Sequence, residues 1–455
     1  MKILFIHECC GRHGGAEENI LATARHLSHS FDLELLCGKH TGKDEGLFSE
    51  VFLKIYMLDW SQDEAALRRR VKQTLSESGP NLVYFHKCLS APLIEAVLEY
   101  DVPTVRMVHD HEVYCMRTYK YFPWSRKTCH YKAGLVCLVP CGAFLMRDRT
   151  KGRLGVRWVS FTQKQRLIHA DQRLDAFIVA SQYMSDELVL QGYDKSKIAI
   201  MAPVPPGEER VSSRLNLLES HKIVFAGQIV RGKGLDCLLR ALALVKVPFE
   251  LVVLGKGSAL PFCQQLANEL GLGNRVHFLG YAPHNEMAIH YHTARLGVVP
   301  SVWPEPFGMV GIEMMQQGIP VIAFDSGGIS DWLKDGETGY LVPNMDVQGL
   351  AEKIELVLTD TELAKRLGRN AVSWVHSRFR FRAYVERLTM KFERMINPDL
   401  RYRWLGVPLH GLAGMSVRPQ PLPQALNRLP GAVKLTGSEL TLSIYPISIS
   451  QKETK

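Results

Sequence analysis

Two glutamates, Glu305 and Glu313, flank the predicted start of a helix in the stretch VVPSVWPEPFGMVGIEMMQQGIPVIAFDSGGISDWLKDGETG, residues 298–339. An apolar run, a loop with two prolines and helical spacing from Gly308 follow one another, which predicts a strand, a loop and a helix. The first amides of a helix lack partners within the helix and lie at the positive end of its dipole. They can therefore bind a phosphate or sugar hydroxyls, and both glutamates can face such a ligand.

A basic loop follows another apolar strand at residues 222–226 and carries Arg231 and Lys233. A helical pattern starts directly after the loop. Two cations beside a helix start could neutralise a diphosphate, because the helix dipole adds to their charge. The alternative is a surface loop whose charges are simply solvated.

Two further candidates lie near the amino terminus. Gly14 and Gly15 stand between a predicted strand at residues 2–7 and a helix that starts near Ala16. A Gly-Gly pair is weak evidence for a nucleotide site, because a tight turn between strand and helix also explains it. His109 follows the apolar strand 104–108, at the edge of a parallel sheet where ligands bind. A capping role is the alternative for this histidine.

These candidates need a parallel sheet to position them. Apolar strands separated by helical patterns recur along the chain, which predicts α/β domains with helices on both faces of each sheet. The predicted parts are a first domain at 1–203, a linker rich in proline at 204–221, a second domain at 222–378, a long amphipathic helix at 379–396 and a poorly ordered tail at 397–455. Residues from about 111 to 160 form an irregular insertion in the first domain, called here the cysteine segment.

The chain has 455 residues and a net charge of +9, which suits two soluble domains and an anionic partner. No apolar run approaches the ~20 residues that span a bilayer. The start, MKILFIH, lacks the layout of a cleavable signal, so we expect a cytoplasmic protein. In that compartment the ten cysteines favour free thiols or a metal site over disulfides.

The residues of the stretch 298–339 resemble the donor-sugar segment of the family 4 retaining glycosyltransferases (glycosyl transferases group 1), and the likeness extends from residue 2 to about residue 394. The matching residues are Glu305, Pro306, Phe307, Gly308, Glu313, Gly318, Pro320, Gly327 and Gly328. The resemblance implies the GT-B fold, in which two Rossmann-like, doubly wound domains face each other across a cleft. The first domain would serve the acceptor and the second the nucleotide sugar, and helix 379–396 would cross back to the first domain.

The resemblance also implies the roles of individual residues. The catalytic residues would be His109, Glu305 and Lys233. The donor-binding residues would be Gly14, Gly15, Arg231, Lys233, Gly255, Tyr281, Glu305, Phe307, Gly308, Met309, Val310 and Glu313. Gln228 stands where the family usually has an arginine, and we expect Arg231 to supply that charge. No metal would be needed for catalysis, because fixed cations and helix dipoles provide the same field.

The implied activity is transfer of a hexose, with retention, from a nucleotide diphosphate sugar to a lipid-linked or polysaccharide acceptor in cell-envelope polysaccharide biosynthesis. Three alternatives share the fold. A nucleotide-sugar epimerase is the first, and a phosphorylase, which would need a pyridoxal lysine motif that we do not find, is the second. A non-catalytic GT-B protein that only binds nucleotide sugars is the third, and the intact Glu305, Glu313 and Lys233 argue against it.

Four cysteines of the cysteine segment, Cys115, Cys129, Cys137 and Cys141, could place four thiolates around one structural zinc ion. Two disulfides or simple buried thiols are the alternatives.

The cysteine segment is also basic and rich in aromatic residues, with Asp148 as the only carboxylate between Arg117 and Phe161. A solvated basic face is one interpretation. Nucleic-acid binding would require a recognised module, and none is present. The third interpretation is an anionic membrane surface, where basic side chains meet lipid head groups and tyrosine and tryptophan lie at the interface. We favour it because the resemblance implies a lipid-linked acceptor that is received through the first domain. The protein would then work at the inner face of the membrane.

Overall fold

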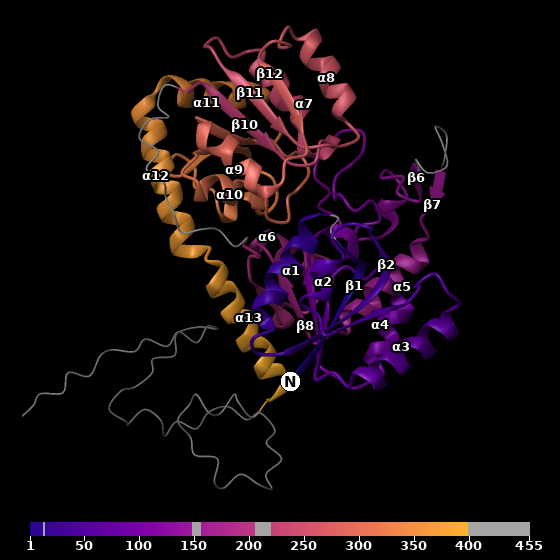
Figure 1. The fold of residues 1–455 in the computed structure, drawn as a ribbon. Helices are drawn as coiled ribbons and strands as arrows, with labels where there is room; N and C mark the ends of the chain where they lie inside the picture. Colours follow the sequence, from indigo (N-terminus) through magenta and orange to yellow (C-terminus); the bar gives the residue numbers. More distant parts are fainter. Residues whose placement is uncertain (12–13, 148–155, 205–219, 399–455) are drawn as a thin grey trace, which may run out of the picture. The chain divides into compact units, whose positions relative to one another are not determined.

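The computed structural model describes residues 1–11, 14–147, 156–204 and 220–398. Two parallel sheets with helices on both faces make up most of the described chain (Figure 1). Nearly all of the predicted linker 204–221 lies outside the described residues, as does the predicted tail from residue 399 on.

The first sheet has seven strands in the order β3-β2-β1-β4-β5-β8-β9, and all of its pairs are parallel. The strands are β1 (Lys2–Cys10), β2 (Asp32–His40), β3 (Lys54–Met57), β4 (Leu82–Phe85), β5 (Thr104–Val108), β8 (Ala176–Val179) and β9 (Ile198–Ile200). The accompanying helices are α1 (Gly15–Leu27), α2 (Gly46–Ser49), α3 (Glu64–Ser78), α4 (Ala91–Leu98), α5 (Phe161–Gln172) and α6 (Gln182–Leu190). The strand order reverses between β1 and β4, so the loops after these strands frame a crevice at the carboxyl edge of the sheet.

The second sheet has six parallel strands in the order β12-β11-β10-β13-β14-β15. They are β10 (Lys222–Ala226), β11 (Glu250–Leu254), β12 (Val276–Gly280), β13 (Leu296–Val299), β14 (Val321–Phe324) and β15 (Gly339–Val342). The helices are α7 (Leu235–Leu242), α8 (Leu260–Glu269), α9 (His284–Thr293), α10 (Met309–Gln316), α11 (Val347–Thr359) and α12 (Thr361–Arg378). The order reverses between β10 and β13, so the basic loop and the Glu305 loop are neighbours.

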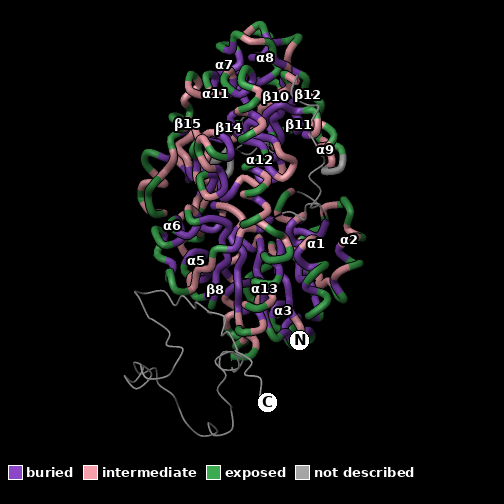
Figure 2. Tube along the Cα trace, turned by 90° about the vertical axis from the view of Figure 1, so that its left-hand side faces the viewer, coloured by how far each residue is buried: buried purple, intermediate pink, exposed green. Residues whose placement is uncertain are grey.

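Helix α13 (Phe381–Ile396) returns from the second domain and packs on the first. Leu388 and Phe392 are fully buried there, and the ring of Phe392 lies 4.9 Å from that of Tyr84 on β4. The sequence pattern explains this packing, because these apolar residues share one face of an otherwise polar helix. Figure 2 shows the strands of both sheets as buried segments, with exposed residues concentrated on helices and loops.

The cysteine segment connects β5 to α5 and has little regular structure. Its described residues contain two 3-10 turns, η1 (His111–Val113) and η2 (Leu135–Cys137), and an antiparallel pair of short strands, β6 (Leu145–Arg147) and β7 (Val156–Trp158). Its apolar cluster is small, so polar contacts hold much of the chain in place. The Arg117 guanidinium, for example, donates hydrogen bonds to the carbonyls of Cys141 and Gly142.

All four cysteines of the proposed zinc site are described and are free thiols. Burial raises the pKa of the Cys129, Cys137 and Cys141 thiols, so these thiols are neutral where no cation is bound. No group of three or more His, Cys, Asp or Glu side chains is arranged to hold a metal anywhere in the described part of the chain. The geometry therefore does not fit zinc. The structural zinc stays a prediction, which metal analysis of reduced protein would test.

Candidate active site

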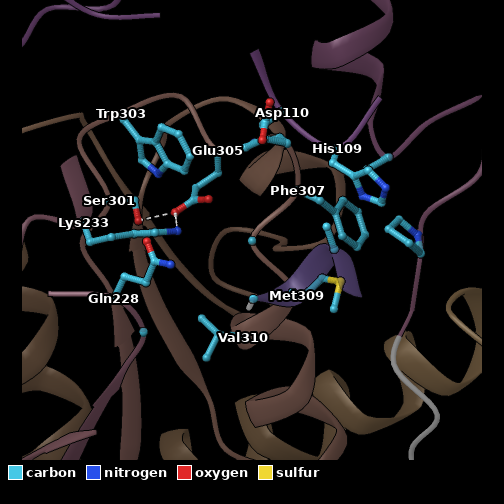
Figure 3. A pocket seen from close by; sticks show the side chains of 18 of the residues that line it. His109, Asp110, Gln228, Lys233, Ser301, Trp303, Glu305, Phe307, Met309 and Val310 are labelled. Atoms are coloured by element: carbon cyan, nitrogen blue, oxygen red, sulfur yellow. Dashed lines mark hydrogen bonds and ion pairs between the residues drawn. The ribbon is translucent and has the colours of Figure 1, made fainter. Parts of the chain in front are cut away.

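A pocket of about 610 Å³ lies between the loops at the carboxyl edges of the two sheets (Figure 3). This volume is within the range of small-molecule sites, roughly 300 to 1,000 Å³. The predicted site residues that line it are Gly14, Gly15, His109, Lys233, Glu305, Phe307, Gly308, Met309 and Val310. The residues predicted to be catalytic therefore face one cavity, although their roles stay predictions.

An ion pair between half-buried Lys233 and buried Glu305 dominates the second-domain wall. Lys233 Nζ lies 2.6 Å from Glu305 Oε1, and the Ser301 hydroxyl donates to the same oxygen at 2.5 Å (Figure 3). Glu305 is only 3% exposed. Burial alone would raise the pKa of this carboxyl, but the charge and the hydrogen bond of Lys233 outweigh it and lower the pKa. Glu305 is thus held as a carboxylate, and the ion pair fixes the position of the Lys233 ammonium in the second-domain wall.

Glycines allow the loops around this pair to approach one another. Gly327 has a φ of +65°, and a Cβ there would lie 2.3 Å from the Glu305 carbonyl oxygen. The amide of Gly328 donates to that carbonyl at 2.7 Å. A glycine lets the backbone approach a neighbouring group without a clash of Cβ. In the structure these glycines let the loop after β14 approach the backbone that carries Glu305.

Helix α10 starts at the pocket, as the sequence predicts. Gly308 precedes it with a left-handed φ of +85°, and Met309 and Val310 in its first turn line the cavity. Phe307 is mostly buried and its ring packs 5.6 Å from that of Phe379, so its side chain belongs to the core. The backbone around Gly308 is therefore the part of this loop best suited to meet a ligand.

The first-domain wall carries more carboxylates than cations. Glu17, Asp110, Glu112 and Lys87 line it, and Lys87 Nζ lies 3.2 Å from Asp110 and 3.3 Å from Glu112. Burial would lower the pKa of Lys87, but the two carboxylates outweigh it and raise the pKa. The pKa of Glu112 is raised, by burial and by the charge of Asp110. The pKa values of Lys87 and Glu112 are therefore both raised. Lys87 gains from two carboxylates, whereas its single charge does not offset the burial of Glu112 and the repulsion from Asp110.

Two buried histidines, His7 and His86, contact residues of this wall. His7 Nε2 lies 3.0 Å from Glu17, and burial of Glu17 is outweighed by His7, which lowers the carboxyl pKa to about 2. His109 Nε2 lies 2.8 Å from Nδ1 of buried His86. Burial and the charge of His7 lower the pKa of His109 to about 3. His109 is therefore a neutral imidazole at physiological pH, and Nδ1 is its nitrogen not engaged by His86.

The triplet Asp110-His111-Glu112 resembles the acidic metal-binding triplet of other glycosyltransferases, but its side chains have protein partners. The His111 Nε2–H donates to the carbonyl of Pro304 at 2.8 Å, and Nδ1 accepts from the Tyr114 hydroxyl at 2.7 Å. Lys87 contacts both carboxylates of the triplet. The bond from His111 to Pro304 connects the first domain to the Glu305 loop.

Four predicted donor-binding residues lie outside the pocket lining: Arg231, Gly255, Tyr281 and Glu313. Arg231 is exposed, whereas Gln228 lines the cavity. Lys233 and Lys87 are the cationic side chains among the described lining residues, so the geometry does not favour Arg231 as the replacement for the usual arginine. Tyr281 is 69% exposed, so its ring is not part of the domain core.

Sequence reasoning missed Lys87, Trp303 and Tyr119, which also line the pocket. Lys87 follows β4 (Leu82–Phe85) by two residues, so the rule that ligands bind at the carboxyl edge could have identified it. Trp303 lies in the sequence between Ser301 and Glu305, whose side chains are hydrogen-bonded to each other. No sequence rule indicates Tyr119, because the conformation of the cysteine segment brings it to the pocket.

Comparison with known proteins decides the family. The model described as Glycosyltransferase Family 4 matches residues 13–203, and the model described as Glycosyl transferases group 1 matches residues 208–374. The two matches together cover most of the chain. The chain belongs to glycosyltransferase family 4.

Curated relatives of this family 4 glycosyltransferase match over part of their length. A D-inositol 3-phosphate glycosyltransferase of Nocardia farcinica is 35% identical over 215 residues, 41% of this chain and 47% of the relative. A GDP-mannose-dependent alpha-(1-6)-phosphatidylinositol monomannoside mannosyltransferase of Mycolicibacterium smegmatis is 30% identical over 196 residues, 41% of this chain and 51% of the relative. The chain thus spans about half the length of the curated relatives it matches.

Solved structures of other glycosyltransferases establish the GT-B fold. Anabaena HepE in complex with UDP has a TM-score of 0.67 at 19% identity and covers 86% of this chain and 100% of its own. A sucrose-phosphate synthase of Thermosynechococcus elongatus has a TM-score of 0.62 at 19% identity, with 87% of this chain and 99% of its own covered. The prediction of two doubly wound domains is confirmed. Among the described helices of this family 4 member, none is long and apolar enough to cross a membrane.

Proposed function

We propose that this family 4 glycosyltransferase moves a hexose, with retention, from a nucleotide diphosphate sugar to a hydroxyl of a lipid-linked or polysaccharide acceptor. The observation that carries the proposal is the ion pair of Lys233 with buried Glu305, which lies beside the start of α10 in the pocket that also contains His109. Such a pair combines a cation for a diphosphate with a carboxylate for sugar hydroxyls.

The donor diphosphate is assigned to the second-domain wall. Lys233 supplies a fixed positive charge there, and the first amides of α10 add hydrogen-bond donors. Gly14 and Gly15 bring the backbone of the first domain to the same cavity. The proposal is supported by the neighbouring structures of Anabaena HepE, which were solved with UDP and with UDP-glucose. Fixed charges of this kind make a divalent ion unnecessary for balancing the leaving phosphate.

Glu305 is assigned to the sugar. Lys233 and Ser301 both contact its Oε1, so Oε2 is the oxygen that would accept hydrogen bonds from donor hydroxyls. Its ion pair and its lowered pKa suit a permanent acceptor of hydrogen bonds rather than a general acid. His109, which is neutral at physiological pH, would meet the sugar through Nδ1, near the reacting carbon.

Retention is assigned to attack on the face from which the phosphate departs. The acceptor oxygen bonds to the anomeric carbon while the bond from that carbon to the phosphate oxygen breaks. The proton of the acceptor hydroxyl passes to the leaving phosphate oxygen. The second-domain wall stabilises the negative charge that develops on the phosphate, which is where a preorganised site contributes most.

The acceptor side is assigned to the first domain and to a membrane surface at the cytoplasmic face, in cell-envelope polysaccharide biosynthesis. Trp124 is 87% exposed and Leu135 is 78% exposed, and exposed Lys127 and Lys132 belong to the same segment. Aromatic, aliphatic and basic side chains together suit anionic lipid head groups. Sedimentation with anionic liposomes tests this assignment. Equal sedimentation with neutral and anionic vesicles, at low and high salt, would contradict it.

A thermal-shift screen of UDP-glucose, UDP-galactose, UDP-N-acetylglucosamine, GDP-mannose and ADP-glucose tests the proposed function. At least one donor should raise the melting temperature, because a ligand that binds only the folded state stabilises it. The release of nucleoside diphosphate from that donor is then measured. Slow release indicates an enzyme that transfers the sugar, and no release indicates a protein that only binds the donor. An epimerised nucleotide sugar as the product would instead identify the alternative enzyme of the same fold.

A further inference from the structure

The cysteine segment contains a turn with unusual backbone conformations. Thr118 has a φ of +69° and Lys120 a φ of +52°, so left-handed residues other than glycine flank Tyr119 on both sides. A β-branched residue such as threonine rarely adopts this conformation. Strained backbone persists only where surrounding contacts enforce it, and it concentrates at functional sites.

Buried polar contacts enforce the turn from the first domain. Lys120 is 3% exposed, and its Nζ donates to the Tyr131 carbonyl at 2.6 Å and pairs with Glu187 on α6 at 3.1 Å. The carbonyl of Lys120 accepts a hydrogen bond from the Cys129 amide at 2.8 Å. These contacts fix both the side chain and the backbone of the residue that follows Tyr119.

Arg126 fastens the same segment to the second domain. Its guanidinium donates two hydrogen bonds to the carboxylate of Asp236 on α7, at 2.6 and 3.0 Å, and a third to the Arg231 carbonyl at 2.6 Å. Arg126 is 7% exposed and is itself left-handed, with a φ of +59°. A bidentate, buried arginine fixes position as well as charge. The segment is therefore held from both domains.

The turn delivers Tyr119 to the pocket. The ring of Tyr119 lies 5.9 Å from that of Trp303 at 63°, and both residues line the cavity. Lys233 Nζ lies 4.9 Å from the centre of the Trp303 ring and 2.6 Å from Glu305. The aromatic pair therefore lies next to Lys233, the cation assigned to the diphosphate.

We propose that Tyr119 and Trp303 form an aromatic wall against which the pyranose ring of the donor packs, and that the cysteine segment sets donor-sugar specificity by positioning Tyr119. This inference rests on the proposed function. A pyranose presents an apolar face of C–H groups, and ring faces of tyrosine and tryptophan provide large, rigid surfaces for such contacts. Arg126 is a positioning residue, because it acts through Tyr119.

Calorimetric titration tests the wall by comparing UDP-glucose with UDP, or GDP-mannose with GDP if the screen selects a guanosine donor. Tyr119→Ala should weaken binding of the nucleotide sugar about tenfold, a loss of one aromatic contact, and leave the nucleoside diphosphate within about twofold. Tyr119→Phe should bind both ligands like the wild type, because it keeps the ring.

Arg126→Gln should reproduce the selective loss of nucleotide-sugar affinity, because it frees the turn. Arg69→Gln, which changes an exposed arginine on α3, is the matched control and should change neither affinity. Equal affinity of Tyr119→Ala and wild type for the nucleotide sugar would overturn the inference, as would an equal loss for both ligands. If the wild type binds no nucleotide sugar at all, the proposed function itself fails.

Discussion

At the scale of single residues, the pair of Lys233 and Glu305 combines charge neutralisation with burial. Removing Lys233 leaves the Glu305 carboxylate buried without its counter-charge, which is more damaging than removing one partner of a surface pair. Each substitution would also remove a contact to a bound donor. Loss of Lys233 removes the cation for the diphosphate, and loss of Glu305 removes the acceptor for the sugar hydroxyls. Activity should therefore be far more sensitive than folding to either substitution.

We expect Lys233→Ala and Glu305→Ala each to lower kcat by roughly 100-fold to 1,000-fold, the loss typical of a missing electrostatic contact in the transition state. Steady-state assays with the donor selected by thermal shift give the measurement, and circular dichroism verifies folding. Lys72→Ala is the control, since it removes an exposed pair in which Nζ lies 2.7 Å from Glu99. Near-normal activity of either pocket variant would disprove the assignment.

Which side chains reach the pocket could be predicted only in part. Lys233, Glu305 and His109 follow strands whose carboxyl edges are visible in the sequence, and all three line the cavity. Residue spacing places Arg231 equally well, because it shares the 3-10 turn η5 (Arg231–Lys233) with Lys233, yet only Lys233 lines the cavity. The direction of a side chain in such a turn depends on backbone angles that residue spacing does not encode.

At the scale of elements, Gly234 controls how the basic loop enters α7. It has a φ of +68°, and a Cβ there would lie 1.8 Å from the Pro300 carbonyl oxygen. The loop and the end of β13 can therefore touch only because this residue has no side chain. Lys233 depends on that approach for its contact with Glu305.

Gly234→Ala should lower the free energy of unfolding by about 3 kcal/mol or more, because left-handed strain adds to a backbone clash. Gly271→Ala is the matched control, since Gly271 also has a positive φ, +71°, but a Cβ at this position would have no heavy atom within 4 Å. Strain alone should cost the control about 1 kcal/mol. Urea denaturation of both variants measures the difference, and equal losses would show that the clash is relieved.

Regular elements were more predictable than the cysteine segment. Alternating apolar strands and amphipathic helices indicate their own positions, because one face of each must be buried. The cysteine segment is held by contacts between residues far apart in the sequence, such as Lys120 with Glu187 and Arg126 with Asp236. No local pattern encodes these pairs, so the sequence revealed the composition of the segment but not its course.

At the scale of the whole molecule, buried histidines make stability depend on pH. Burial lowers the pKa of His86 well below its usual value of 6.5, that of His109 to about 3 and that of His111 to about 4. The folded protein therefore keeps these imidazoles neutral where the unfolded chain protonates them. Because the unfolded chain binds more protons below pH 6.5, stability falls as the pH falls through that value.

Denaturation at about pH 7 and about pH 5 should show a lower free energy of unfolding at the lower pH, with a slope of up to about 1.4 kcal/mol per histidine per pH unit. His111→Gln should reduce that slope, whatever it does to absolute stability. His26→Gln, at an exposed position, is the control for the substitution itself. A free energy of unfolding that is the same at both pH values would contradict the assignment of neutral, buried imidazoles. Below pH 4.5, protonation of Glu17, whose pKa is lowered to about 2, should add to the loss.

The return of α13 means that the polypeptide passes between the two domains twice, once between residues 204 and 220 and once between α12 and α13. A protease that severed the first passage would leave two pieces, and the carboxyl-terminal piece would still have Leu388 and Phe392 inserted in the core of the other. The halves would remain associated without a peptide bond between them. Two separately produced chains, divided at that point, could for the same reason assemble into one enzyme.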